Sequence, residues 1–274
     1  MKSNTSCAKN PYLAIFKMYA INEMTYRGKV LLGMSTQVFW GLMYVLMYTA
    51  FYATGNAPSG FSLTELTSYI WLGQAFFVFR YIGRDARITD SIIKGDVAYE
   101  FIRPLDLYNC WYAKNLAEKL VGTALRGAPI LLLGFLLPVG LGLMLPTSLS
   151  AFLLFCLSLI IGLMLAVGIN MFINILTFKT MSPRGIAGMV SVVTGLLGGY
   201  YIPLPLMPAG IRAVLDYLPF RYISDLPYRI YVGAIDAPNA IIFILIQIFW
   251  LAVILFTGRL LLKSCLKNVE VQGG

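Results

Sequence analysis

The chain has 274 residues, of which 59% are apolar and only 12% are charged, and its mean hydropathy is +0.77. Uncharged runs of about 18 residues or more recur along it, which is more apolar sequence than a soluble core requires. The composition therefore indicates an integral membrane protein. The absence of histidine excludes imidazole catalysis and His-containing metal sites.

The first segment, residues 11–28, carries Lys17, Glu23 and Arg27 together with aromatic residues at helical spacing. It is too polar to span a bilayer, so we expect an amphipathic helix that lies on the membrane surface. The uncharged run that follows, residues 30–53, is long enough to cross, since a span needs roughly 20 helical residues. The sequence TGNAPSG then ends this first span.

Further spans are expected at residues 66–79, 128–145, 149–178, 185–201 and 240–256. The run at 149–178 is longer than a bilayer requires, so that helix is expected to tilt or to extend beyond the membrane. The predicted fold class is an all-α membrane protein, with six transmembrane helices in a single domain over residues 1–274.

The predicted orientation follows from the lysines and arginines of the loops, which are enriched on the cytoplasmic side of membrane proteins. With the amino terminus inside, 18 of the 21 basic residues fall in inner segments, and only Arg212, Arg221 and Arg229 fall outside. Both termini are therefore expected in the cytoplasm, in a multi-pass membrane protein. The net charge of +9 is spread over four loops, so we expect no nucleic-acid partner.

The outer segment before the last span, residues 202–237, contains five prolines that prevent one continuous helix. A short apolar face between Ile211 and Leu218 remains, and we expect a re-entrant hairpin of two short helices that dips into the outer leaflet. Irregular backbone at that depth is tolerated only where protein or water satisfies it. The alternative is a compact loop that lies on the headgroups.

The sequence carries few signs of catalytic chemistry. It has no G-x-x-x-x-G-K-[ST] phosphate loop and no C-x-x-C pair. No acidic pair lies within a predicted span, where an ionisable residue usually marks function. We therefore expect no catalytic, cofactor or metal site in this chain, so a transporter with this sequence would need an external source of energy.

The longest predicted inner loop, residues 80–127, is where a partner protein that supplies this energy (a motor) could attach. Within RDARITDSIIKGDVAYEFIRPLDLY, three isoleucines form an apolar edge and Gly95 is a helix stop. A short amphipathic helix is therefore expected, and Pro104 turns the chain toward the next span. Such a helix could lie on the bilayer or insert into a groove on a cytosolic partner.

The runs IIKGDVAYEFIRPLDLY, YRIYVG and VEVQGG resemble the ABC-2 family of bacterial ABC transporter permeases, and the resemblance covers nearly the whole chain. It implies a permease subunit of an exporter that pairs with a like or related permease. Separate cytosolic ATP-binding subunits would carry the ATP and Mg²⁺. By this likeness the inner-loop helix is the coupling helix, carried by Ile88, Ile92, Gly95, Glu100, Arg103 and Pro104.

Two other function classes are kept beside this one. An ion-coupled secondary carrier is disfavoured by the lack of carboxylates in the predicted spans. A membrane-embedded enzyme is disfavoured by the lack of histidine and of acidic pairs.

A polar and aromatic stripe on the first span gives a candidate translocation path, formed by Gln37, Trp40, Tyr44 and Tyr48 and continued by Phe51. Ordinary helix packing with an outer aromatic belt explains this stripe equally well. Asn170 and Asn174, one turn apart, are expected to form hydrogen bonds between helices.

Overall fold

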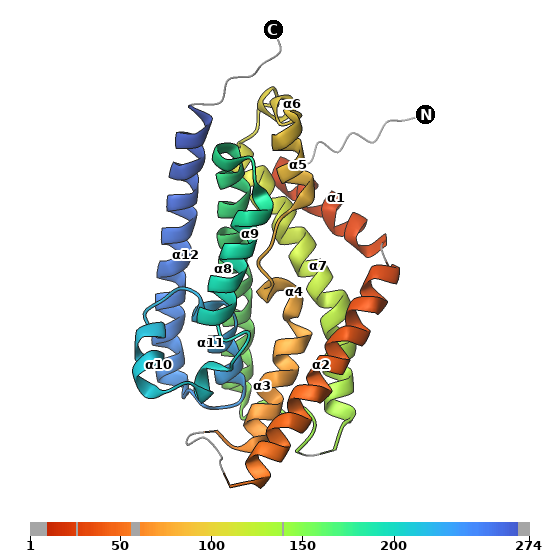
Figure 1. The fold of residues 1–274 in the computed structure, drawn as a ribbon, viewed down its shortest axis with the longest axis vertical. Helices are drawn as coiled ribbons and strands as arrows, with labels where there is room; N and C mark the ends of the chain where they lie inside the picture. The colour runs from red at the N-terminus through yellow and green to blue at the C-terminus, as the bar shows by residue number, and fades with distance from the viewer. Residues whose placement is uncertain (1–9, 26, 56–60, 139, 268–274) are drawn as a thin grey trace.

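The computed structural model describes residues 10–25, 27–55, 61–138 and 140–267, and within these ranges the chain is helical without strands. Four helices are long and apolar enough to cross a membrane: α2 (Arg27–Ala53, in its part from Val30), α7 (Leu107–Leu136), α8 (Leu149–Thr180) and α12 (Ala237–Leu266). They form an elongated bundle (Figure 1). At about 1.5 Å per residue, a 30-residue helix is about 45 Å long, longer than a bilayer core of about 30 Å.

The shorter elements fill in and extend this bundle. They are α1 (Pro11–Thr25), α3 (Leu63–Ala75), α4 (Phe77–Arg80), α5 (Ala86–Lys94), α6 (Ala98–Phe101), α9 (Pro183–Leu197), the 3-10 turn η1 (Leu204–Leu206), α10 (Ala209–Leu215) and α11 (Arg221–Tyr231).

The expected second and fifth spans are not single membrane-crossing helices. In place of the span 66–79, α3 has 13 residues and ends at Ala75, and α4 adds only four residues after it. In place of the span 185–201, α9 has 15 residues, about 22 Å. The structure thus has four helices of membrane-crossing length within the described residues, where six were expected.

The expected third span, 128–145, has wrong boundaries. Helix α7 begins at Leu107 and ends at Leu136, so the second half of the expected inner loop 80–127 is helix and the sequence after Leu136 is not. The early end has a local cause, because Leu137 precedes a proline and takes an extended conformation. The early start escaped prediction because α7 carries charged residues that have partners inside the protein, described below.

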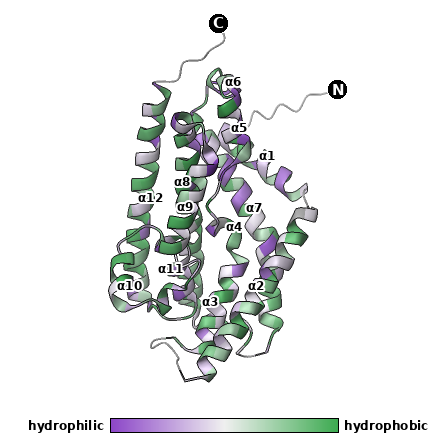
Figure 2. Ribbon diagram, viewed as in Figure 1, coloured by the Kyte–Doolittle hydropathy of each residue, from purple (hydrophilic) through white to green (hydrophobic). Residues whose placement is uncertain are grey.

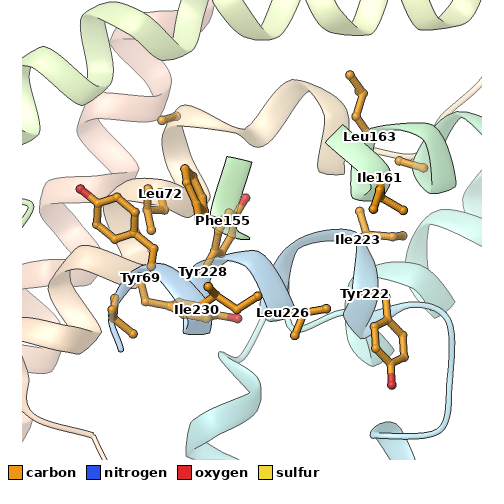
Figure 3. Close-up of a cluster of buried hydrophobic side chains, with 14 of the residues drawn as sticks. Tyr69, Leu72, Phe155, Ile161, Leu163, Tyr222, Ile223, Leu226, Tyr228 and Ile230 are labelled. Atoms are coloured by element: carbon orange, nitrogen blue, oxygen red, sulfur yellow. The ribbon is translucent and has the colours of Figure 1, made fainter. Parts of the chain in front are cut away.

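The centre of the bundle is α8, which packs along its length on α12 and at one end on α11. All but one of the residues of α11 are buried, although the helix holds two arginines and an aspartate. Figure 3 shows Tyr228 and Ile230 of α11 on the side of Tyr69 and Leu72 of α3, and Ile223 of α11 beside Ile161 of α8. The segment 202–237 therefore contains two short helices, as expected, and the second is buried in the protein.

Polar groups fix α11 inside this apolar core. The amide of Gln247 on α12 donates to the carbonyl oxygens of Tyr222 (2.7 Å) and Ser158 (2.8 Å), and so joins three helices. On α11, Arg221 pairs with Asp216, and Asp225 accepts a hydrogen bond of 3.0 Å from the hydroxyl of Tyr69. Buried polar groups with partners define one packing arrangement, because an unpaired group there is costly.

The two ends of the bundle differ in polarity. The end of α12, helix α1 and helices α5 and α6 lie together at the upper end in Figure 1, while α10 lies toward the other end. Figure 2 shows hydrophilic residues gathered at the end with α1, α5 and α6, whereas α8 and α12 are hydrophobic along most of their length. The first and last described helices thus reach the same end, as the charge pattern predicts for two termini on one side.

Helices α8 and α11 pack so closely that a single methyl group would separate them. A Cβ atom at Gly162 would lie 2.5 Å from the backbone oxygen of Ile223, and backbone cannot move aside cheaply. Gly162→Ala should destabilise the protein by about 1–3 kcal/mol through overpacking. Thermal unfolding of the detergent-purified protein, followed by tryptophan fluorescence, measures this as a lower melting temperature. Gly188→Ala on α9 is the control, since a Cβ there meets nothing within 4 Å. Equal melting temperatures for the two variants would contradict the close packing of α8 on α11.

Candidate functional site

Helix α5 is the short amphipathic helix that the sequence predicts, and it has a cap at each end. The Asp85 carboxylate accepts from the backbone N–H of Arg87 at 3.0 Å and thus caps the helix start. Gly95 ends the helix with a left-handed conformation, φ +81°, which glycine adopts without strain. The predicted amphipathic helix and its glycine stop are confirmed.

The apolar edge of α5 faces the interior of the chain. Ile88 and Ile92 are buried, with Ile92 only 5% exposed, in a cluster with Trp111 of α7 and Ile175 of α8. The family resemblance implied that these two isoleucines form a docking face for a partner. In the structure they instead anchor α5 to the bundle of their own chain. An aspartate at Ile92 would disrupt the packing of α5 on the bundle, because it would place a charge in the buried cluster.

The segment EFIRPLDLY continues from α6 to the start of α7. The carboxylate of Glu100 accepts a hydrogen bond of 2.6 Å from the indole N–H of Trp111, and this bond fixes α6 on α7. Arg103 and Pro104 are exposed. Beside them Tyr99 and Ile102 are 71% and 80% exposed, so this turn carries an outward apolar tip. We call residues 86–106 the α5–α6 unit.

Ion pairs hold α5 and Asp85, the residue that caps it, to α7. Lys114 of α7 lies 3.3 Å from the carboxylate of Asp85, with both side chains buried, and Arg87 pairs with Glu118 of α7 at 3.0 Å. Breaking a buried pair by removing one partner typically costs about 3–5 kcal/mol. The charges of α7 thus serve to attach α5, and this explains why a helix with these charges still fits inside the bundle.

Helix α1 braces the same region. The ring of Tyr19 lies under Lys114 at 5.3 Å and under Arg87 at 5.7 Å, and burial raises the pKa of its phenol. The hydroxyl of Tyr12 accepts from the backbone N–H of Asp106. The aromatic face of α1 therefore packs on the protein, while Met18, Ile21 and Met24 are exposed on its other face.

The backbone between α3 and α5 leaves helical geometry inside the bundle. Helix α3 ends at Ala75, α4 lies about halfway along the bundle (Figure 1), and no helix follows until Ala86. We call residues 76–85 the break segment. Helix interruptions at membrane depth persist only where the protein satisfies the freed backbone groups.

Side chains of α7 and α8 form hydrogen bonds with the free backbone groups of the break segment. The ammonium of Lys119 donates to the carbonyl oxygens of Tyr81 at 2.6 Å and of Val78 at 3.3 Å. The backbone N–H of Gly83 donates to Asn170 at 3.1 Å, and the Asn170 amide donates to Asn115 at 3.2 Å. The prediction that Asn170 forms hydrogen bonds between helices is confirmed. The buried Asn174 has no hydrogen-bond partner in the described part of the chain.

Arg80, the last residue of α4, lies beside two neighbouring cavities. The larger is about 200 Å³ and is lined by Arg80, Ser191, Thr194, Phe220 and Ser224 among others. The guanidinium of Arg80 lies 4.6 Å from the centre of the Tyr200 ring. A glycine bend places Tyr200 there: Gly199 has φ +77°, and the N–H of Tyr200 donates back to the carbonyl of Gly195. We call this the Arg80 cavity.

The stripe expected along the first span is divided by the structure. Tyr44 and Tyr48 line the smaller cavity, of about 30 Å³, together with Arg80 and Tyr201. Gln37 is buried, whereas Trp40 is exposed outside the bundle, as is Phe51. The structure therefore brings two of the path residues to Arg80 and leaves the others apart from it.

Sequence reasoning missed Arg80 as part of a site, because it treated this residue as the end of a span. It also missed Tyr200 and Lys119. A signal for the break was present: Arg80 follows an apolar run of only 14 residues after Glu65, which is too short to cross a bilayer. From the sequence, Arg80 was placed at the end of a span, whereas in the structure α4 ends with this arginine halfway along the bundle.

A family-wide sequence profile described as ABC-2 family transporter protein matches residues 38–273. This range contains the break segment, the α5–α6 unit, YRIYVG and most of VEVQGG, which itself lies outside the described residues. Comparison with curated proteins finds no match. Because the profile covers far more than half of the sequence, together with helices of membrane-crossing length, the chain belongs to the ABC-2 family of transporter proteins.

Proposed function

We propose that the chain is the permease subunit of an ATP-driven exporter in a bacterial inner membrane, with both termini in the cytoplasm. It forms half of a translocation pathway with a second permease of the same or a related kind. Separate cytosolic ATP-binding subunits, which carry ATP and Mg²⁺, supply the energy. Family membership supports the assignment as a transport permease. The α5–α6 unit supports the proposed attachment site of the ATP-binding subunits, which act as the motor.

The observation that carries this proposal is the outward tip of the α5–α6 unit. Tyr99 and Ile102 expose apolar surface at the polar end of the bundle, beside the cation of Arg103. At the same time Glu100 holds α6 on α7, and the ion pairs of Arg87 and Lys114 bind α5 to α7. A firmly attached turn with an apolar tip can transmit movement from a partner into the bundle.

We propose that the chain crosses the membrane six times. Four crossings are the long helices. The other two are α3 with the break segment and α9 with the turns that follow it. The buried α11 then belongs to a re-entrant hairpin on the outer side, and α1 lies at the inner surface with its exposed apolar residues toward lipid.

An ion-coupled carrier is the second function class, and the buried charges make it worth testing. Arginine keeps its charge at any physiological pH, so Arg80 is not a proton carrier. The buried carboxylate of Asp85 is paired with Lys114 near the α5 end of the bundle. Transport that stops when the ion gradient collapses, in vesicles still supplied with ATP, would favour the carrier over the ATP-driven permease.

The orientation is tested by labelling single cysteines from outside intact cells, in a background without the native cysteines. Tyr217→Cys, at an exposed site after α10, should react with a membrane-impermeant maleimide. Tyr99→Cys in α6 should react only after the membrane is opened. The reverse pattern would contradict the proposed orientation.

The motor attachment is tested by Ile102→Asp and Arg103→Ala. Both residues are exposed, so the variants should insert at normal levels yet lower transport and transport-linked ATP hydrolysis together, by about tenfold if the contact is a binding hot spot. Leu145→Asp, an exposed leucine between α7 and α8 at the other end of the bundle, is the matched control. The purified complex is assayed for ATPase activity and for a subunit with a phosphate loop. Normal activity in both loop variants would place the motor contact elsewhere.

A further inference from the structure

The guanidinium of Arg80 has no counter-charge in the described part of the chain. No carboxylate there lies within ion-pair distance of it, and its buried Nε atom has no hydrogen-bond partner. Its close neighbour is the ring of Tyr200. Tyrosine hydroxyls titrate near pH 10 and are uncharged at neutral pH, so Tyr200 does not neutralise the arginine.

The Arg80 side chain is partly buried and has no carboxylate beside it, which is unfavourable inside a bundle. Burial of an unpaired charge is strongly unfavourable, and within membrane domains such residues face a cavity or a partner and mark ligand paths. Two fully buried cations show the contrast: Lys114 pairs with Asp85, and Arg221 pairs with Asp216. Arg80 instead lines a cavity of about 200 Å³.

The walls of the Arg80 cavity suit an oxyanion. Its lining includes the hydroxyls of Ser191, Thr194 and Ser224 and of three tyrosines. The hydroxyls of Thr194 and Ser224 donate to backbone carbonyl oxygens and can still accept a hydrogen bond. The hydroxyl of Ser191 can donate to an oxyanion. Phosphate and carboxylate groups are the partners for which the planar fork of arginine is shaped. The break in the helix contributes as well, because interrupted membrane helices place polar groups at substrate sites near mid-membrane.

The surroundings of the cavity are apolar. On α9, next to the lining residues Ser191 and Thr194, the side chains of Val192, Val193 and Leu196 are exposed on the outside of the bundle. A ligand with its charged group at Arg80 would therefore have apolar surface beside it for a hydrocarbon tail. The chemistry is that of an amphiphile with an anionic head.

We propose that the Arg80 cavity binds the phosphate or carboxylate head group of an amphiphile, and that anionic amphiphiles are the cargo class of this transporter. The cargo part rests on the proposed transport function. The site itself does not, since binding requires neither ATP nor a partner subunit.

Binding to the purified chain in a neutral detergent tests the proposal by native mass spectrometry. Dodecyl phosphate is the probe, dodecyltrimethylammonium is the amphiphile with the same chain and the opposite charge, and inorganic phosphate is the head group alone. We expect dodecyl phosphate to bind most tightly, and Arg80→Gln to weaken it by about tenfold or more, as for a charge-assisted hydrogen bond. Arg184→Gln, an exposed arginine on α9, should leave binding unchanged.

Several outcomes would overturn the proposal. Equal binding of dodecyl phosphate by Arg80→Gln and the unchanged chain would exclude Arg80 as the counter-charge. Equal binding of the ammonium amphiphile would exclude an anion site, and equal affinity for inorganic phosphate would exclude an amphiphile. If Arg80→Gln does not fold, Ser191→Leu narrows the cavity while it keeps the arginine, and unchanged binding in that variant would also contradict the site. Failure of the chain to recruit an ATPase would refute the transport function alone.

Discussion

The break segment imposes the constraint on which much of this structure depends. A helix that stops halfway along an apolar bundle exposes backbone groups where no water can satisfy them. Lys119 of α7 and Asn170 of α8 meet this need, and Asn115 orients Asn170 in turn. These polar side chains, which would be costly if unpaired, are therefore stabilising here.

The break segment also joins the two regions to which we assign function. Arg80 lies at its centre and Asp85 at its end, where the Asp85 carboxylate caps α5 and pairs with Lys114. A displacement of the α5–α6 unit by a partner would thus reach the Arg80 cavity through five residues of backbone. The proposed motor contact and the proposed head-group site lie along one short stretch of chain.

The sequence predicted most reliably what depends on local signals. The helix from Ala86 to Lys94, its stop at Gly95, and the long apolar helices α8 and α12 follow from caps and hydropathy. It failed where a residue's environment depends on distant partners. Hydropathy counts Lys114 and Glu118 as loop residues, because it does not know that Asp85 and Arg87 pair with them inside the protein.

The same reasoning explains the errors at the sites. An apolar edge such as Ile88 and Ile92 predicts that a helix face is buried, but not whether its own chain or a partner buries it. Arg80 was assigned to a loop because a charge usually ends a span. Only the fold shows that α3 stops halfway along the bundle and that the glycine bend brings Tyr200 to this arginine.

The claim that side chains of neighbouring helices hold the break is tested most directly at one amide. The N–H of Gly83 bonds to Asn170, so Asn170→Leu should speed hydrogen–deuterium exchange in the peptide that contains residues 81–85. Asn174→Leu is the matched control, one turn away on the same buried face of α8, and should leave that peptide unchanged. Exchange that is unaltered in Asn170→Leu, or equally fast in both variants, would contradict the account.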